Sequence, residues 1–339
     1  MLTKDLDFSF PKELIALEPS RPCRVAFVAP QALPVEMNLG GLLNQFAAGD
    51  LLVINETKVI PARVFSVDEI EVLFLKSLDS ERWEVLFQAR DFKPGDVLRM
   101  PYDLTLTLES KGLPQIVKLS RPIDEAYLQK CGEVALPPYI QQARGQRHNR
   151  AQDLAWYQTD WAQKSGSIAA PTASLHFQAS DLDSLRARGV KIAKITLHVG
   201  AGTFLPVRSE ILTDHTMHAE PVEISPSTMK QIAQTKQAGR RVWALGTTVA
   251  RALESQAHGL LNQTPDGGFA GATQLFVYPP FQFRTVDVLM TNFHQPKSTL
   301  FGLVAAFAGL EQAHSVYAWA IERRFRLFSY GDLSVWMKP

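Results

Sequence analysis

The stretch that decides the fold covers residues 165–207 and reads SGSIAAPTASLHFQASDLDSLRARGVKIAKITLHVGAGTFLPV. Apolar and polar residues alternate over 192–199, and a two-residue period is typical of a β-strand with one buried face. Ile195, Leu197 and Val199 share the apolar face, so His198 points to the opposite side. The alternation therefore predicts a strand that delivers a histidine to its own carboxyl end.

The segments on either side of this strand predict a ligand-binding crevice. Gly200, Gly202 and Thr203 follow the strand, and such residues let the backbone turn sharply and expose N–H groups to a ligand. Upstream, residues 167–177 place Pro171, Thr172 and His176 among small residues, a composition typical of a tight loop at a pocket. We expect His176 and His198 to flank one crevice.

Length, charge and cysteine content limit the class of protein. A chain of 339 residues favours two domains, and 35 Lys plus Arg against 34 Asp plus Glu is not the balance of a strongly basic nucleic-acid binder. The two cysteines form no CxxC pair, so neither a disulfide framework nor a zinc knuckle is indicated. There is no signal-peptide run, and the apolar stretch 300–310 is too short to span a membrane. We expect a cytoplasmic protein without a membrane segment.

Two different sequence patterns along the chain predict two domains. Short alternating runs recur between residues 67 and 120, separated by turn residues, and five such strands favour a small β-barrel or sandwich. Residues 1–62 and 150–339 instead mix strands with helices. We predict an α/β main domain with a mixed sheet, formed by 1–62 plus 150–339, and an inserted all-β barrel at 66–140.

Other predicted strands also end in polar residues. LLVIN at 51–55, RVWAL at 241–245 and VDVLMT at 286–291 read as buried strands, and QLFVY at 274–278 reads as a further one. Ligands of open α/β sheets bind beyond the carboxyl ends of the strands, and helix starts favour anions. The residues that follow two of these strands are therefore candidate ligand contacts: Thr247, Thr248, Asn292, His294 and Lys297.

The linker between the predicted domains is basic. Arg144, Arg147 and Arg150 occur in a stretch without an acidic residue from 135 to 152, and such a stretch is able to follow a phosphate backbone. A solvated linker explains the same charges equally well.

Five of the eight histidines fall in predicted loops or strand ends: His176, His198, His215, His218 and His294. Imidazole titrates near neutral pH and also binds metals, so proton transfer and metal binding both stay open. The HTMH sequence at 215–218 lacks the HExxH pattern of zinc proteases. Neither GxGxxG, since Leu205 replaces the third glycine, nor GxxxxGK[ST] nor GxSxG is present.

Several long motifs, in one order along nearly the whole chain, resemble the S-adenosylmethionine:tRNA ribosyltransferase-isomerase (QueA) family. They read GDLLVINETKVIPAR, LPPYI, SGSIAAPTASLHF, TLHVGAGTFLPV, HTMHAE, ALGTTVARALES, LMTNFHQPKSTLFGLVAAFAG and FSYGD. The resemblance implies an enzyme of queuosine biosynthesis that uses S-adenosylmethionine as co-substrate and acts on the anticodon loop of tRNA. It would transfer and isomerise the ribosyl part onto 7-aminomethyl-7-deazaguanine, giving epoxyqueuosine and releasing adenine and methionine.

Such a reaction needs a base beside the sulfonium and an acid for the departing adenine. The candidates are His176, His198 and His218, with Glu220 as a residue that orients them. We expect S-adenosylmethionine to be held by residues of the loops and strand ends named above: Thr172, Gly200, Gly202, Thr203, Phe204, Thr247, Thr248, Asn292 and His294. RNA contacts are expected from Arg144, Arg147, Arg150 and Lys297, and neither a metal nor an oligomer is expected.

Four positions depart from the usual pattern of the family: Ser174, Pro221, Pro280 and Gln295. Two other classes of protein stay open. A metal-dependent hydrolase would use the histidines as ligands, and a non-catalytic RNA-binding paralogue would bind tRNA without releasing adenine.

Overall fold

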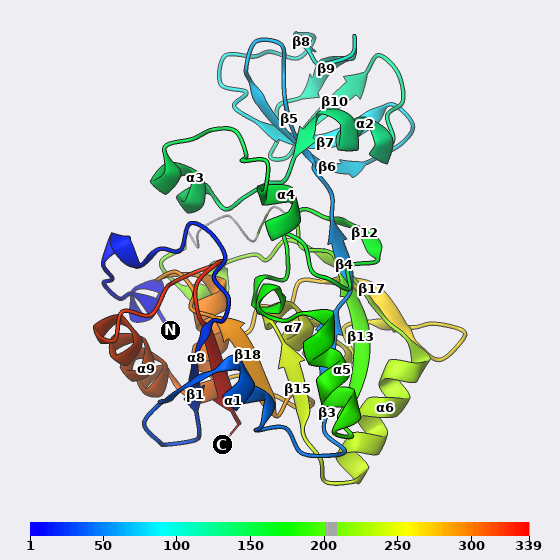
Figure 1. Cartoon of the computed structure of the whole chain (residues 1–339). Coiled ribbons are helices and arrows are strands. Elements are labelled where there is room, and N and C mark those ends of the chain that lie inside the picture. Colours follow the sequence, from blue (N-terminus) through cyan, green and yellow to red (C-terminus); the bar gives the residue numbers. More distant parts are fainter. Residues whose placement is uncertain (201, 203–208, 339) are drawn as a thin grey trace.

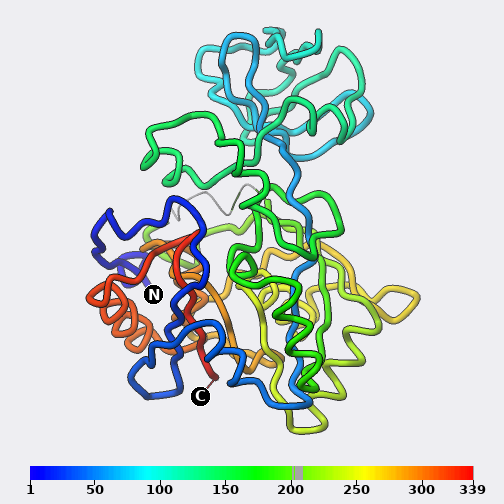
Figure 2. Tube along the Cα trace, viewed as in Figure 1, coloured from blue at the N-terminus to red at the C-terminus, as the bar shows by residue number. Residues whose placement is uncertain are grey.

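The computed structural model describes residues 1–200, 202 and 209–338. Figure 1 shows a large body, in which helices cover both faces of a sheet, and a smaller all-β unit joined to it by a narrow waist. The chain enters and leaves the smaller unit once, as the trace in Figure 2 shows. Both termini lie in the large body.

The main sheet has ten strands and is mixed, as predicted. The four central strands β13, β3, β15 and β18 run parallel to one another, while most outer pairs are antiparallel. The spatial order is β16 (Asn262–Gln263), β17 (Phe269–Thr273), β14 (Glu220–Ile224), β13 (Lys191–Leu197), β3 (Leu51–Asn55), β15 (Val242–Leu245), β18 (Val288–Asn292), β19 (Leu333–Met337), β1 (Arg24–Val28) and β2 (Val35–Asn38).

The central strands are buried on both faces, which explains their continuous apolar sequences. In β3, Leu51 and Val53 belong to one core cluster and Leu52 and Ile54 to the other, because successive side chains point to opposite faces. The first cluster includes side chains of α6 (Pro226–Gln237), α7 (Thr247–Ala257), α8 (Thr299–Ala308) and α9 (Leu310–Glu322). The second includes α1 (Leu39–Leu43) and α5 (Ala179–Ala187), which lie in front of the sheet in Figure 1.

The smaller unit is an antiparallel seven-stranded sheet with its own apolar core, closed at one side by α2 (Glu125–Cys131). It curls into a half-barrel whose edges are β11 and β8. Its order is β11 (Gly132–Glu133), β5 (Arg63–Phe65), β6 (Glu71–Ser77), β7 (Arg82–Phe87), β10 (Gln115–Leu119), β9 (Thr105–Ser110) and β8 (Val97–Arg99). The α/β fold with an inserted barrel-like sheet is confirmed. The limits 1–62, 66–140 and 150–339 stay a prediction, since strand pairing does not set a domain boundary.

The waist consists of two connections. β4 (Thr57–Val59) pairs in parallel with β12 (Lys164–Ser167), so the outgoing and returning segments lie side by side. The returning segment also contains α3 (Pro138–Arg144) and α4 (Asp153–Trp156). Tyr139 of α3 donates its hydroxyl proton to Ser329 Oγ at 2.5 Å, which ties this linker to the main body.

The apolar sequence QLFVY at 274–278 is not a strand, contrary to the prediction. It follows β17 directly and runs into Pro279 and Pro280, which have no N–H group to donate to a neighbouring strand. Val277 is nevertheless buried in the core, so the apolar pattern marked burial rather than strand pairing. Short 3₁₀ helices complete the described chain: η1 (Thr3–Leu6), η2 (Lys12–Leu14), η3 (Thr172–His176) and η5 (Leu212–Asp214). None of the helices in the described part is long and apolar enough to cross a membrane.

A buried carboxylate holds α7 against the segment that leads into β18. Glu254 is fully buried, and its two oxygens accept hydrogen bonds from the backbone N–H groups of Arg284, Thr285 and Val286 at 2.8–3.0 Å. The bonds to Thr285 and Val286 satisfy donors that would otherwise be buried without partners. Glu254 therefore fixes the helix that begins at the carboxyl end of β15.

We expect Glu254→Ala to lower the free energy of unfolding by roughly 2–4 kcal/mol, because the buried N–H groups of Thr285 and Val286 and the part-buried one of Arg284 lose their acceptor. Urea denaturation followed by circular dichroism measures this change. Glu322→Ala, at an exposed position of α9, is the matched control and should shift stability by less than about 0.5 kcal/mol. Equal stability of the two variants would contradict the assigned role of Glu254.

Candidate active site

The carboxyl ends of the four parallel strands meet at one edge of the main sheet. β13 leads to His198, β3 ends at Asn55, β15 leads to Gly246 and β18 ends at Asn292. β19 runs antiparallel to β18, so the turn before it, which includes Gly331, lies at the same edge. This is the edge at which open α/β sheets bind ligands.

A cavity of about 330 Å³ lies at this edge. Its wall combines strand ends, the loop before η3, the start of α7 and the linker helix α3. The lining side chains include six of the predicted contacts, namely Thr172, Thr247, Thr248, Asn292, His294 and Lys297, together with Tyr139 and Arg251. Residues separated by more than a hundred positions thus share one hollow.

Asn292 is the centre of a buried polar network. Its Oδ1 accepts a hydrogen bond from Thr172 Oγ1 at 2.8 Å, and its Nδ2 donates to the carbonyl oxygen of Gly331 at 3.2 Å. The same Nδ2 lies 3.1 Å from His176 Nε2. These partners lock the amide in one orientation at the cavity wall.

His176 lies behind the cavity wall, and its ring contacts Asn292 instead of lining the cavity. Burial lowers the pKa of His176 to about 4, with the charges of Arg21 and Arg326 acting in the same direction. The ring is therefore neutral at pH 7, and its Nε2 accepts the proton of Asn292 Nδ2. The sequence placed His176 directly at the crevice, whereas the structure gives it contact through Asn292.

His294 lines the cavity. Its Nε2 lies 2.7 Å from Thr291 Oγ1, and its backbone N–H donates to the hydroxyl of Tyr317 at 2.9 Å. Burial lowers the pKa of His294 to about 3, so this ring also is neutral at pH 7. A neutral imidazole offers one hydrogen-bond donor and one acceptor, either to a ligand or to neighbouring side chains.

His198 lies outside the cavity wall that the described residues form. The strand alternation holds, because Val199 lines the cavity while His198 points to the opposite face. There His198 Nδ1 lies 2.7 Å from Thr57 Oγ1, and burial lowers its pKa. Gly166 has a φ of +140°, and a Cβ atom on it would lie 3.2 Å from the ring, so a larger residue at this position would be strained. Neither His176 nor His198 lines the cavity that the described residues form, so the expectation that they flank one crevice stays a prediction.

Glu220 joins the predicted glycine turn to α7. It is 3% exposed, accepts a hydrogen bond from the backbone N–H of Gly200 at 3.1 Å and forms an ion pair with Arg251. His218 packs on the same turn, since a Cβ atom on Gly202 would lie 2.4 Å from its Cδ2. Thr203 and Phe204, which were predicted to hold the co-substrate, lie outside the described residues.

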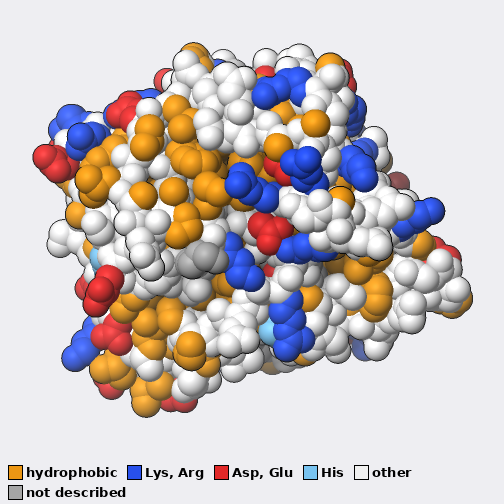
Figure 3. Space-filling model, turned by 90° about the horizontal axis from the view of Figure 1, so that it is seen from below, with side chains coloured by type: hydrophobic (Ala, Val, Ile, Leu, Met, Phe, Trp, Pro, Cys, Tyr) orange, Lys and Arg blue, Asp and Glu red, His pale blue; other side chains and the backbone are white. Residues whose placement is uncertain are grey.

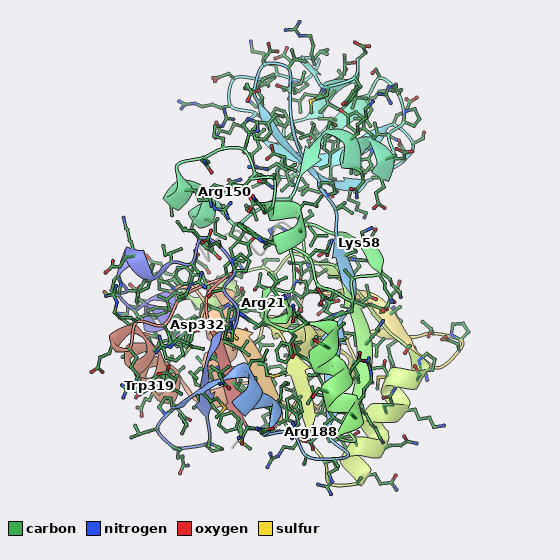
Figure 4. All side chains as sticks on the ribbon, in the orientation of Figure 1. Arg21, Lys58, Arg150, Arg188, Trp319 and Asp332 are labelled. Carbon is green, nitrogen blue, oxygen red and sulfur yellow. The ribbon has the colours of Figure 1, made fainter. Side chains whose placement is uncertain are left out.

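The basic residues predicted to contact RNA have different environments. Arg144 is 2% exposed at its side chain and pairs with the buried Asp153 at 2.7 Å, so it holds α3 and α4 together and offers no charge to the surface. Arg147 and Arg150 are at the surface of the waist, where Figure 4 labels Arg150. Lys297 pairs with Asp7 at 2.7 Å and borders the cavity.

No group of three His, Cys, Asp or Glu side chains in the described part of the chain has the geometry to hold a metal ion. His215 and His218, the sequence pair closest to a metal motif, belong to no such group. His215 packs its ring edge-on against Phe276, at 5.4 Å between centroids.

Sequence reasoning missed Arg251 and Tyr139 as cavity residues. Arg251 follows Thr247 by four positions and Thr248 by three, a spacing that places all three on one face of a helix. That spacing was available once the helix start at 247 had been predicted. Tyr139 gave no such signal, because only the docking of α3 onto the main body brings it to the cavity.

We expect the buried neutral histidines to make the protein less stable in acid. Unfolding returns both rings to their ordinary pKa near 6.5, so below that pH the unfolded chain binds more protons than the folded one. Stability should fall as the pH drops from about 6.5 toward 4, by about 1.4 kcal/mol per pH unit for each ring. Urea denaturation from pH 7 to pH 4.5 measures this slope, and His294→Gln should reduce it. The same slope in both proteins would contradict the assignment.

The chain as a whole is similar to proteins of one family. A family model described as "Queuosine biosynthesis protein" matches residues 3–335. A relative from Rhodopseudomonas palustris, named S-adenosylmethionine:tRNA ribosyltransferase-isomerase, is 41% identical over 99% of this chain and 98% of its own length. A relative of the same name from Sulfurihydrogenibium is 40% identical over 98% of both chains.

A solved structure is also similar. The crystal structure of S-adenosylmethionine tRNA ribosyltransferase from Thermotoga maritima is 30% identical, with a TM-score of 0.56 over 98% of this chain and 100% of that one. The match extends from the first 3₁₀ helix to the last strand and includes every element of the cavity. This chain therefore belongs to the S-adenosylmethionine:tRNA ribosyltransferase-isomerase (QueA) family of queuosine biosynthesis.

Proposed function

We propose that the chain transfers and isomerises the ribosyl moiety of S-adenosylmethionine onto 7-aminomethyl-7-deazaguanine at the wobble position of tRNA. The product is epoxyqueuosine-tRNA, and adenine and methionine are released. One observation carries this function: the chain matches enzymes of this activity over nearly its full length. The cavity adds support, because Thr172, Asn292 and His294 meet at the sheet edge that binds ligands.

The neutral, hydrogen-bonded side chains of the cavity suit the binding of an adenosyl group. Asn292 and Thr172 are held in place by buried partners, so they keep their orientation without reorganisation when a ligand enters. We assign His176 to positioning Asn292, since its ring contacts the amide. His294 supplies a neutral ring at the wall.

Proton transfer is assigned to the side of the cavity where β13 ends and β14 begins. Glu220 contacts the backbone of Gly200 and pairs with Arg251, which lines the cavity. His218 packs against Gly202 in the same turn. Glu220 and His218 are therefore the acid–base candidates next to the cavity. His198 contacts Thr57 outside the described cavity wall, and it stays a candidate that requires substrate binding to bring its ring into the site.

The tRNA is expected to dock at the waist. The net charge of +1 requires a local basic patch for a polyanion, and Arg147 and Arg150 lie at the surface of the waist. The face of the large body that points away from the waist, shown in Figure 3, instead carries Lys and Arg side chains mixed with acidic and hydrophobic ones. Figure 4 places Lys58 and Arg150 at the waist, above the large body. Arg147 and Lys297 would extend this surface to the cavity mouth, into which the wobble nucleotide must be splayed.

Three accompanying properties belong to the same proposal. We infer that the enzyme works in the cytoplasm, where its tRNA substrate is found, that it acts as a monomer, and that it uses no metal. The reaction requires proton transfer and leaving-group departure, and the described side chains of the cavity wall offer groups for hydrogen bonding and proton transfer.

The direct test is incubation of the purified chain with S-adenosylmethionine and tRNA that carries the deazaguanine precursor. We expect stoichiometric release of adenine and methionine, which chromatography measures. A chelator should not reduce the turnover. tRNA without the precursor is the control. Binding of tRNA without adenine release would support the non-catalytic alternative, and inactivation by the chelator would support the hydrolase.

We expect Asn292→Asp to reduce kcat/KM by roughly 100-fold or more, because the amide loses its donor to His176 and to the Gly331 carbonyl. Adenine release measures the rate, and thermal denaturation separates lost activity from lost folding. Asn262→Asp, at an exposed position of β16, is the matched control and should retain activity. Retention of full turnover by Asn292→Asp would remove this residue from the site.

A further inference from the structure

Two polar groups of α7 are buried at the cavity without a hydrogen-bond partner among the described residues. They are Arg251 Nη2 and Thr248 Oγ1. Both residues line the cavity, and Arg251 is 5% exposed. Burying a donor without an acceptor is costly, and the cost is largest for a charged group. Such a pair at a cavity wall indicates a ligand that supplies the missing acceptors.

The remaining contacts of Arg251 fix its guanidinium group. Nε donates to the carbonyl oxygen of Leu275 at 3.1 Å, and Nη1 pairs with Glu220. Two edges of the planar fork are therefore held by protein groups, and Nη2 is the nitrogen left for a ligand. A guanidinium held in this way loses little conformational freedom when it binds an anion.

Thr248 and Arg251 are three positions apart, so they lie on one face of the helix. Thr248 is in the first turn of α7, an eleven-residue helix, where the unpaired N–H groups and the helix dipole favour a negative charge. The orphan hydroxyl, the orphan guanidinium nitrogen and the positive helix end thus select the same kind of ligand group.

We propose that Arg251 and Thr248 bind the α-carboxylate of the methionine part of S-adenosylmethionine. This inference rests on the proposed function. The carboxylate is the only anionic group of this co-substrate, whereas its ammonium and sulfonium groups are repelled by a guanidinium. Its two oxygens accept one hydrogen bond from Arg251 Nη2 and one from Thr248 Oγ1, which satisfies both orphan donors.

A phosphate of tRNA fits the site less well than a carboxylate. Arg251 is almost fully buried, and the cavity of about 330 Å³ has room for a small molecule but not for a nucleic-acid backbone. The exposed arginines of the waist, such as Arg147, are the suitable partners for phosphates. Arg251 therefore serves as a specificity residue for the amino-acid end of the co-substrate.

The test compares two probes, S-adenosylmethionine and its decarboxylated analogue, which lacks only the carboxylate. Calorimetry measures the Kd of each probe for the full chain. We expect the unmodified protein to bind the analogue roughly 10- to 100-fold more weakly, the range for a charged hydrogen-bonded contact. The ratio of the two Kd values, analogue to S-adenosylmethionine, should fall toward 1 in Arg251→Met and in Thr248→Val. Each variant removes one of the two groups that bind the carboxylate.

Matched controls remove the same chemical groups elsewhere. Arg188→Met changes a surface arginine at the far end of the large body, labelled in Figure 4, and Thr235→Val removes a buried hydroxyl of α6 that lines no part of this cavity. Both should keep the ratio of the unmodified protein. Thr248→Val leaves the Arg251–Glu220 pair intact, so it gives an answer even if Arg251→Met does not fold.

Equal affinity of the unmodified protein for the two probes would overturn the inference, as would an unchanged ratio in Thr248→Val. The proposed function fails differently. If adenine is released from S-adenosylmethionine while both probes bind equally, only the role of Arg251 and Thr248 is wrong. If the protein neither binds S-adenosylmethionine nor releases adenine, the proposed function and this inference both fall.

Discussion

Parallel pairing of four strands is the constraint on which the site depends. β13, β3, β15 and β18 run in one direction, so the polar residues that follow them reach one edge of the sheet. β19 runs the other way and brings the turn at Gly331 to the same edge. Their apolar side chains fill two cores, one on each face, and this burial holds the edge in place. The cavity is a consequence of strand direction rather than of any single loop.

Buried polar groups then give the edge its chemistry. Asn292 is locked by Thr172, His176 and the Gly331 carbonyl, and Glu254 fixes the helix that carries Thr248 and Arg251. Each of these groups is satisfied by partners from distant segments, which makes the arrangement cooperative. Burial keeps the two deepest histidines neutral, so they act as hydrogen-bonding groups at physiological pH. Arg251 Nη2 differs from these groups, because it has no hydrogen-bond partner among the described residues.

The waist connects the half-barrel to the main body and is held by side-chain contacts. Tyr139 contacts Ser329 of the main body, and the buried pair of Arg144 and Asp153 joins α3 to α4. Because α3 forms part of the cavity wall, the segment that returns from the half-barrel also closes the site. RNA docked at the waist, as we propose, would therefore lie next to the cavity that we propose for the co-substrate.

The sequence by itself determined the mixed α/β sheet, the inserted β unit and the polar strand ends that line the cavity, because periodicity and turn residues are local signals. It placed Asn292, His294 and Thr247 correctly at the carboxyl edge. Only the tertiary structure decided which side chains share the cavity. A period of two puts His198 opposite Val199 but does not say which face adjoins the hollow, and the burial of His176 behind Asn292 depends on packing between distant segments. The role of Arg251 could be inferred only from the tertiary structure, which shows that Leu275 and Glu220 bind two of its nitrogens and that Nη2 has no partner among the described residues.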